Sequence, residues 1–298
     1  MPVQYAVRME HVDGLNYYQE SFPLWVARDG VCTVCDWHTH AFVELAIVVA
    51  GHGVHETPDA AFAISAGDVF LVAGTEPHGY RDCEQLSLVN VIYDPATLDF
   101  PFLYLAKHPG YQALFVVEPQ YRERHSTLHH LRVSMHELSQ VTVILDNLEE
   151  ELVRQSAGFE AAAIVQFTSL LLFLARAYQH QVSACSPNIL RLGKVLSLLE
   201  SRFTEKLTVT ELAEVANLSL SHFERIFTET MGLAPMEYVI HLRMNKAEKL
   251  LRSTPMPITE VAYQVGYGDS NFFTRQFKKT FQCTPQQYRR SAGGGVGR

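Results

Sequence analysis

The sequence lacks an apolar stretch long enough to predict a membrane span. The longest candidate, around residues 169–177, is interrupted by Arg176, whereas an α-helix needs about 20 apolar residues to cross a bilayer. The N-terminus also lacks a basic segment followed by an apolar core, which is the pattern of a secretory signal peptide. Both absences predict a cytoplasmic protein without a membrane partner.

Cysteine is scarce, with five residues among 298. Cys32 and Cys35 form a C-x-x-C pair, but no second pair accompanies it, as zinc sites of this kind require. The flanking residues are typical of a strand, in which residues three apart project to opposite faces. We therefore expect buried thiols here rather than a redox or zinc pair.

Positive charge is also in deficit, because 24 Lys and Arg stand against 32 Asp and Glu, a net charge of −8. Taken alone, this balance argues against nucleic acid as a partner. The distribution reverses the argument: residues 1–187 contain 9 Lys and Arg against 22 Asp and Glu, and residues 188–298 contain 15 against 10. A cationic C-terminal third on an acidic remainder indicates that only this third meets phosphate.

The length predicts two domains, and the hydrophobic pattern changes along the chain. Up to about residue 95, short apolar runs alternate with Gly, Pro and Asp turns, one of them at residues 51–53, which is typical of a β-sandwich or barrel. From about 97 to 180, apolar residues recur at spacings of three and four, which predicts two antiparallel helices joined near Gly158. These helices, within about residues 128–180, pack on the β-domain, form a subunit interface, or do both.

The remaining chain is predicted to be helical. Residues 181–188 are small and polar and end in Pro187, which predicts a linker, and the Gly-rich residues 292–298 predict a disordered tail. The expected fold is therefore α+β with two domains, a β-barrel followed by helices in residues 1–180 and an all-α domain in residues 189–291. Its expected helices span about residues 189–203, 209–217, 219–231, 235–252, 258–265, 269–281 and 285–290.

Two segments of the C-terminal domain share one pattern. Each starts a helix with an aliphatic residue, Thr and Glu, and continues through Ala213 or Ala262, where two helices must approach closely. A turn leads to Ser219 or Asp269, which are expected N-caps whose helix ends can face phosphate. The following helix carries two phenylalanines four residues apart: Phe223 and Phe227, or Phe273 and Phe277. This is the layout of a helix-turn-helix, present twice.

The phenylalanines share a buried face, which leaves polar residues on the open face of each second helix. Arg can pair with guanine and Asn with adenine in the major groove, while Ser, Thr and Lys mostly hold phosphates. Glu224 departs from this chemistry, since it would either accept from cytosine or repel phosphate. The residues expected to contact DNA are Ser221, His222, Glu224, Arg225, Ser270, Asn271, Thr274, Arg275 and Lys278.

A second candidate site lies in the β-region. His38, His40 and Glu44 have the same parity, so a strand would direct them to one face, and His78 could join them from a neighbouring strand. Three imidazoles and a carboxylate suit a divalent metal such as Zn, Ni, Mn or Fe. Some of these histidines could instead only satisfy buried strands. His52 and His55 flank Gly53 in the next turn, a place that suits surface residues.

The C-terminal motifs resemble the DNA-binding domain of the AraC/XylS family over about 100 residues. The resemblance rests on residues 243–251, 258–262, 265–279 and 285–289. It implies a sequence-specific transcription regulator whose two recognition helices enter successive major grooves of double-stranded DNA. It further implies that the chain forms a homodimer and contacts RNA polymerase.

The β-region resembles the cupin pattern H-x-H-x(3)-E-x(6)-G from His38 to Gly51. The second cupin motif keeps His78 but departs from the pattern at Ala73 and Thr75. With the stretch at 110–119, the region is similar to the sugar-sensing jelly-roll domain of the rhamnose-type AraC regulators.

This second resemblance implies a sugar-like effector inside the barrel and leaves two interpretations of the four residues open. They hold a divalent metal, or they hydrogen-bond a polyol effector without metal. Trp25, Trp37 and Tyr80 are expected to form the walls of the pocket. The alternative function is a metal-dependent cupin enzyme fused to a DNA-binding module. We assign no catalytic residue, because no further acid–base pair is recognisable near the pocket. We therefore expect that the protein is not an enzyme.

Overall fold

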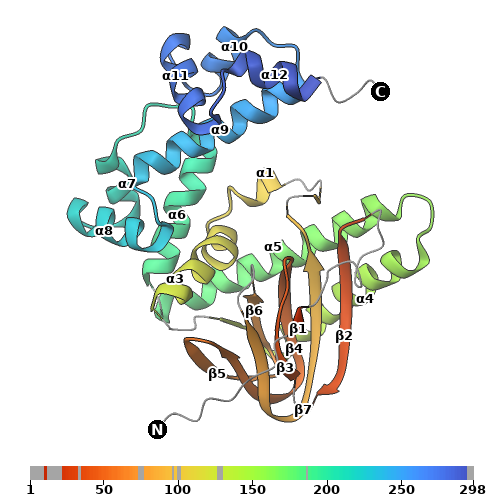
Figure 1. Ribbon diagram of the computed structural model, residues 1–298. Helices are drawn as coiled ribbons and strands as arrows, with labels where there is room; N and C mark the ends of the chain where they lie inside the picture. The colour runs from red at the N-terminus through yellow and green to blue at the C-terminus, as the bar shows by residue number, and fades with distance from the viewer. Residues whose placement is uncertain are drawn as a thin grey trace. The chain divides into compact units, whose positions relative to one another are not determined.

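The computed structural model describes residues 10–11, 22–32, 35–72, 77–95, 97–98, 102–125, 130–185 and 187–293. The chain divides into two compact units, Met1–Gly193 and Lys194–Arg298. The first is a β-sheet followed by helices and the second is helical (Figure 1). The expected α+β class is therefore confirmed.

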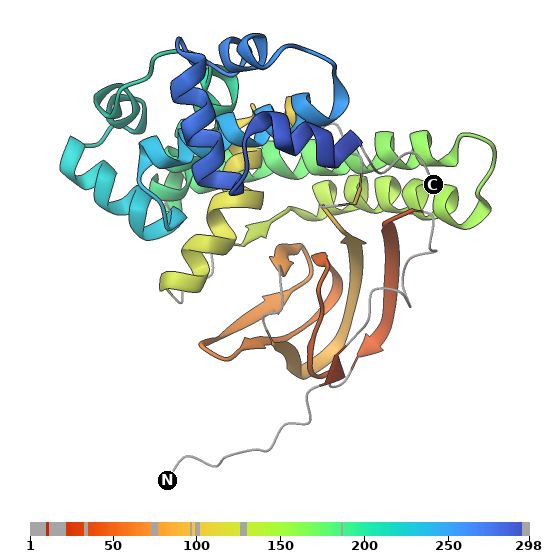
Figure 2. The ribbon, with the colours of Figure 1, turned by 45° about the horizontal axis from the view of Figure 1, so that its top comes forward.

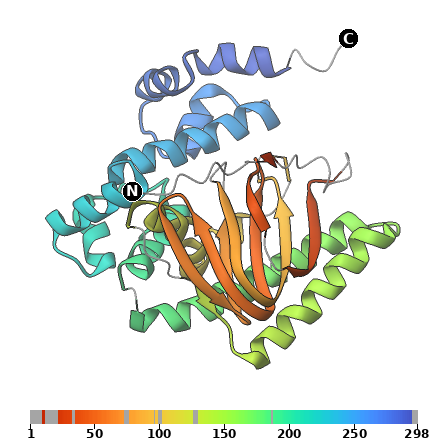
Figure 3. The same cartoon turned by 60° about the horizontal axis from the view of Figure 1, so that its bottom comes forward.

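Within the described residues, the first unit contains one sheet of eight strands. They are β1 (Glu10–His11), β2 (Leu24–Cys32), β3 (Cys35–Thr39), β4 (Val43–Thr57), β5 (Ala60–Ser65), β6 (Asp68–Val72), β7 (His78–Tyr93) and β8 (Leu131–Arg132). The order is β1-β3-β7-β4-β6-β8, with β2 also on β7 and β5 also on β4. The long strands β4 and β7 thus pair with each other and with two further strands each, and the sheet curls (Figures 2 and 3).

The apolar run in β4 is buried on both sides of the sheet. Leu45 and Ile47 alternate with Ala46 and Val48, and all four are at most 1% exposed. Residues paired across antiparallel strands project to the same side, so the partners of Ala46 and Val48 share their face. We call this the inner face; its apolar residues are Ala46, Val48, Ile64, Phe70, Val72, Tyr80, Leu86 and Leu88.

The prediction of a turn at residues 51–53 is wrong, because β4 runs through these residues. The β4–β7 register shifts between Val48 and Val54, as it does where a β-bulge inserts a residue. Gly51 has φ of +71°, and a Cβ there would lie 2.1 Å from the carbonyl oxygen of Gln85. Glycine therefore marks a bulge inside a strand here, and the chain reverses only at residues 58–59.

Short helices connect the sheet to a long helical pair. They are α1 (Phe102–Leu105), α2 (Pro109–Tyr111), the π-helix η2 (Gln112–Val117) and α3 (Glu118–His125). The pair itself is α4 (Met135–Arg154) and α5 (Phe159–Cys185), which lie side by side and reverse at Gly158, as predicted (Figures 1 and 3).

Helix α5 corrects the expectation about membrane spans. Its segment Phe159–Gln181 has a mean hydropathy of 1.5 and is long and apolar enough to cross a membrane by length and composition. A core helix passes the same test, and Phe167, Leu170 and Leu174 of α5 are fully buried. The ring of Phe167 lies 5.0 Å from that of Tyr93 in β7, so this apolar side faces the sheet.

The expected linker is mostly helical. Helix α5 continues to Cys185 and α6 (Pro187–Arg202) begins two residues later, while residue 186 lies outside the described residues. The small residues before Pro187 can continue a helix, and proline at a first helical position starts the next one. A Cβ on Gly193 would lie 2.6 Å from the carbonyl oxygen of Pro109. The first turns of α6 therefore pack in the first unit, and the division between the units falls within α6.

The remaining helices follow their predicted bounds within about three residues. They are α7 (Val209–Ala216), α8 (Leu220–Met231), α9 (Pro235–Ser253), α10 (Ile258–Gln264), α11 (Ser270–Phe281) and α12 (Pro285–Gly293). Ala213 and Ala262 are buried, as are all four phenylalanines that were expected on the inner sides of α8 and α11. Of the expected tail, residues 294–298 lie outside the described residues.

Candidate functional site

The first helix-turn-helix is formed by α7 and α8. Thr208 and Glu211 form a reciprocal capping box at the start of α7, and Asn217 ends that helix in the left-handed region, with φ of 52°. Ser219 occupies the N-cap position of α8, as predicted, but its side chain makes no capping hydrogen bond.

The second helix-turn-helix consists of α10 and α11, and different contacts stabilise its turn and the start of its second helix. Gly266 in its turn has φ of +90°, and a Cβ there would lie 2.4 Å from the carbonyl oxygen of Thr204. The Asp269 carboxylate accepts from the backbone amides of Asn271 (2.6 Å) and Phe272 (3.1 Å). These two bonds lower the pKa of Asp269. They also occupy two amides of the helix end that was expected to face phosphate.

The residues expected to contact DNA lie on the open sides of α8 and α11. Six are exposed: Ser221, Glu224, Arg225, Asn271, Arg275 and Lys278. Three are half-buried: His222, Ser270 and Thr274. The two arginines differ in their partners, because Arg225 Nη1 donates to Glu229 at 2.7 Å, whereas the Arg275 guanidinium lies 5.7 Å from the ring centre of Phe272.

Phe272 is a further candidate for DNA contact that was not among the expected residues. Its side chain is 44% exposed, although it adjoins the fully buried Phe273. An exposed aromatic ring at the start of a recognition helix can contact the methyl group of thymine. The signal was the doubled Phe in the second copy, where the first copy has His222 and Phe223.

The structure brings together the four residues of the predicted metal site. His38, His40, Glu44 and His78 each offer a ligand atom, and these atoms lie within 4.8 Å of one another. His38 is half-buried and the other three are buried. His38 and His78 are register partners on β3 and β7, with ring centres 4.2 Å apart.

His40 and Glu44 meet across a bend, not along one strand. Strand β3 ends before His40, and β4 begins at Val43. His40 Nδ1 lies 2.9 Å from the carbonyl oxygen of Phe42, which can only accept, so this nitrogen carries a proton. His40 Nε2 lies 3.4 Å from Glu44 Oε2. His40 Nε2 has no hydrogen-bond partner among the described residues, so a cation or the hydroxyl hydrogen of a ligand could bind at these two atoms.

The surroundings of Glu44 favour a carboxylate despite its burial. Burial acts to raise the pKa of Glu44, but the close approach of His40 and the charges of His78, His40 and His38 outweigh it. The pKa of Glu44 is therefore lowered. An ionised, buried carboxylate among three imidazoles can bind a divalent cation or accept hydrogen bonds from a ligand's hydroxyl groups.

His55 is a fourth histidine near the cluster, and it was expected at the surface. That placement is wrong, because His55 is 1% exposed, while His52 on the same strand has a side chain 58% exposed. His55 pairs with Tyr80 in the β4–β7 register, and its ring centre lies 5.7 Å from that of His78. Burial, together with the charges of His78, Arg122 and His38, lowers the pKa of His55 well below its ordinary value.

The three expected aromatic walls of the pocket are placed differently. Tyr80 is buried on the inner face. Trp25 is half-buried and pairs with Ile92, itself the register partner of Glu44, so it lies on the inner side. Trp37 is half-buried and lies in β3 within the register shift between Cys35 and His38.

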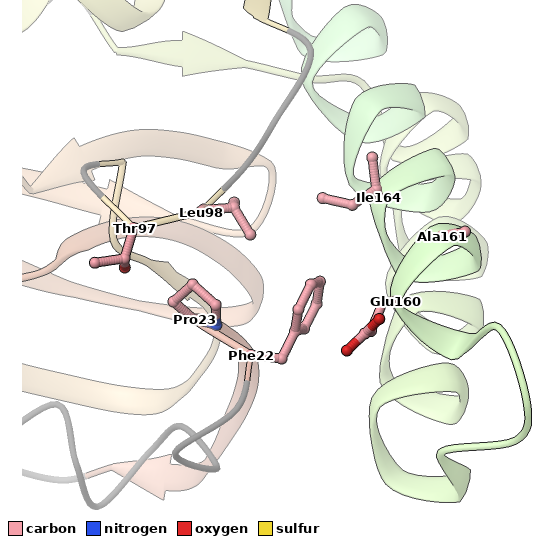
Figure 4. Close-up of a pocket in the computed structure, with 7 residues that line it drawn as sticks. All are labelled: Phe22, Pro23, Thr97, Leu98, Glu160, Ala161 and Ile164. Atoms are coloured by element: carbon pink, nitrogen blue, oxygen red, sulfur yellow. The ribbon is translucent and has the colours of Figure 1, made fainter. Parts of the chain in front are cut away.

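A separate cavity of about 440 Å³ lies where the sheet meets α5. Figure 4 shows residues near β2 on one side and the first turns of α5 on the other. Its lining residues are Phe22, Pro23, Thr97, Leu98, Glu160, Ala161 and Ile164. No residue of the histidine cluster lines it.

The comparisons with known proteins cover both regions. Residues 33–163 match the AraC-like ligand binding domain, and residues 212–291 match a helix-turn-helix domain. The chain is 28% identical over 274 residues to the HTH-type transcriptional activator RhaR of Mannheimia succiniciproducens, covering 92% of this chain and 89% of that protein. It is 32% identical over 252 residues to the activator RhaS of Enterobacter sp. strain 638, covering 85% and 86%. The chain therefore belongs to the AraC family of DNA-binding transcription regulators and has the family's N-terminal ligand-binding domain.

Proposed function

We propose that this regulator is controlled by a sugar-like small molecule that binds on the inner face of the sheet. The observation that carries the proposal is the buried polar cluster of His38, His40, Glu44 and His78. Burying polar groups costs free energy unless a partner satisfies them, and ligand pockets combine apolar walls with a few convergent polar groups. The relatives named above are transcriptional activators, which favours a regulator over a cupin enzyme.

The route from effector to DNA runs through α6. This helix packs in the first unit around Gly193 and continues into the second. The first turns of α6 could take more than one position in the first unit. An effector that binds more tightly when they take one of these positions would shift the population of DNA-binding arrangements. A difference in affinity of a few kcal/mol between two arrangements suffices for this.

A divalent metal in the cluster is the second proposal. Four nitrogen and oxygen donors within 4.8 Å of one another suit Zn, Ni, Mn or Fe. Elemental mass spectrometry of the untagged protein, beside a His38→Ala/His78→Ala variant, tests it. About one equivalent in the wild type and none in the variant is the expected result; no metal in either, after incubation with all four ions, contradicts it.

Homodimerisation through α4 and α5 is proposed from their exposed apolar side chains. Met135, Val143, Val153 and Val165 are each more than half exposed. We expect Val143→Glu to shift the protein toward monomer in sedimentation experiments, and Val215→Glu on α7 serves as the control. We further propose that the regulator acts in the cytoplasm and contacts RNA polymerase, as expected of an activator.

The sugar proposal is tested by DNA binding. DNA selected in vitro supplies the operator, and fluorescence anisotropy measures the affinity of the full chain with and without a panel of free monosaccharides. We expect at least one sugar to change the affinity, without any sugar being consumed. If no sugar changes it, the effector class is wrong; turnover of a sugar would instead favour the enzyme alternative.

A further inference from the structure

The ring of His55 is enclosed on the inner face without hydrogen bonds. Its side chain is 1% exposed, and neither Nδ1 nor Nε2 has a hydrogen-bond partner among the residues that the structure describes. Buried polar side chains in native proteins nearly always have a partner, so an exception needs an explanation. A purely structural position in this apolar setting would be better filled by an apolar side chain.

The ring of His55 lies among aromatic side chains of the inner face. Its ring centre lies 4.9 Å from that of Phe70 and 5.2 Å from that of Tyr80. The cluster continues from His78 to His38, whose ring centre is 4.2 Å from that of His78. Aromatic surfaces with a few polar groups are the usual lining of small-molecule pockets.

His55 is not one of the four candidate metal ligands, whose donor atoms lie within 4.8 Å of one another. A neutral imidazole offers one N–H donor and one acceptor nitrogen. Both can be satisfied at once by a molecule that carries neighbouring hydroxyl groups. A cation site differs, because its ligand atoms need to offer only lone pairs.

We propose that His55 is a specificity-determining contact for the effector, exchanging hydrogen bonds with neighbouring hydroxyl groups of a monosaccharide. The sugar's apolar C–H face then packs on Phe70 and Tyr80, while His78 and its cluster hold the other edge of the ring. This inference rests on the proposed sugar effector. It adds a residue and a discrimination rule: a sugar that lacks the hydroxyl facing His55 leaves the imidazole unsatisfied and is rejected.

The experiment uses the full chain and three variants. His55→Phe keeps a flat ring but removes both polar atoms, and His55→Gln keeps one donor group and one acceptor. His52→Phe is the matched control, because His52 lies on the same strand with its side chain largely exposed. Thermal unfolding without sugar comes first, followed by isothermal titration with free monosaccharides and their singly deoxygenated counterparts.

The expected result has two parts. Without sugar, His55→Phe unfolds at the same temperature as the wild type or higher, because an unsatisfied polar group has been removed. For the best-binding monosaccharide, His55→Phe raises Kd about tenfold or more, His55→Gln raises it less, and His52→Phe leaves it within about twofold. One deoxy counterpart should bind the wild type and His55→Phe equally.

Three results overturn the inference. A Kd in His55→Phe within twofold of the wild type would remove His55 from the effector site and leave the sugar proposal standing. Strong destabilisation without sugar would assign His55 a structural role; if His55→Phe does not fold at all, an unchanged Kd in His55→Gln decides against the inference. Failure of every monosaccharide to bind the wild type would overturn the sugar proposal itself, and the inference with it.

Discussion

The two helix-turn-helix units share one layout and are stabilised by different contacts. In the first, the capping box of Thr208 and Glu211 starts α7 and α8 has no side-chain cap. In the second, α10 has no side-chain cap and Asp269 caps α11. A repeated sequence pattern thus specifies where helices start and pack, while the stabilising bonds move from one helix end to another.

The recognition helices also differ in charge. Helix α8 presents Arg225 with Glu224, and Glu229 is hydrogen-bonded to that arginine. Helix α11 presents Arg275 and Lys278, and none of its residues from Ser270 to Phe281 is acidic. Because phosphate contacts dominate affinity for DNA, we expect α11 to contribute more to binding than α8.

The largest predicted difference concerns the turns. Gly266→Ala places a Cβ in a left-handed conformation against the backbone of Thr204 and should lower the free energy of unfolding by about 3 kcal/mol. Asn217→Ala, at the left-handed position of the first helix-turn-helix, should lower the free energy of unfolding by about 1 kcal/mol. Urea unfolding measures both, and equal losses would contradict the difference between the turns.

The next difference concerns the two arginines. Arg275→Ala should weaken binding to the selected operator by ~1–3 kcal/mol and relax base preference at one position. Arg225→Ala should cost less, since Arg225 must give up Glu229 to reach DNA. Anisotropy on the operator and its single-base variants separates these effects. Equal loss on all sequences would show that Arg275 only holds phosphate.

A smaller difference concerns the caps. Asp269→Ala should lower the unfolding temperature, whereas Ser219→Ala, which removes no capping bond, should leave it nearly unchanged. The amides of Phe272 and Asn271 lower the pKa of Asp269 below its ordinary value of 3.8. Its contribution is therefore complete above about pH 4 and is lost as the pH falls through the lowered pKa. The two variants should accordingly converge in stability in strong acid; a gap that persists there would point to another cause.

The smallest predicted effect tests the pairing of Arg225. Glu229→Gln removes the charge that holds this arginine and should strengthen DNA binding by about twofold to threefold, since exposed ion pairs are worth ~0.2–1 kcal/mol. Glu205→Gln, which removes the similarly exposed i,i+3 partner of Arg202, is the control. If both variants strengthen binding equally, general loss of negative charge explains the effect.

Local patterns predicted the helical domain well. The spacing of Phe223, Phe227, Phe273 and Phe277 required only the geometry of a single helix, and all four are buried. The β-region was harder to predict from sequence. The parity argument for His40 and Glu44 named residues that do meet, but they meet across a bend after β3.

The sequence by itself determined the two helix-turn-helix units, the two-domain α+β class and the four residues of the cluster, because these depend on contacts within a few residues or on short ordered motifs. Only the tertiary structure decided the burial of His55 and the continuity of α5 toward α6. The side of a sheet on which His55 lies depends on bulges in the β4–β7 register, and a one-residue shift in register exchanges the two faces. Likewise, the apolar side of α5 has a partner only once the sheet has formed, since Phe167 packs on Tyr93, 74 positions earlier in the chain.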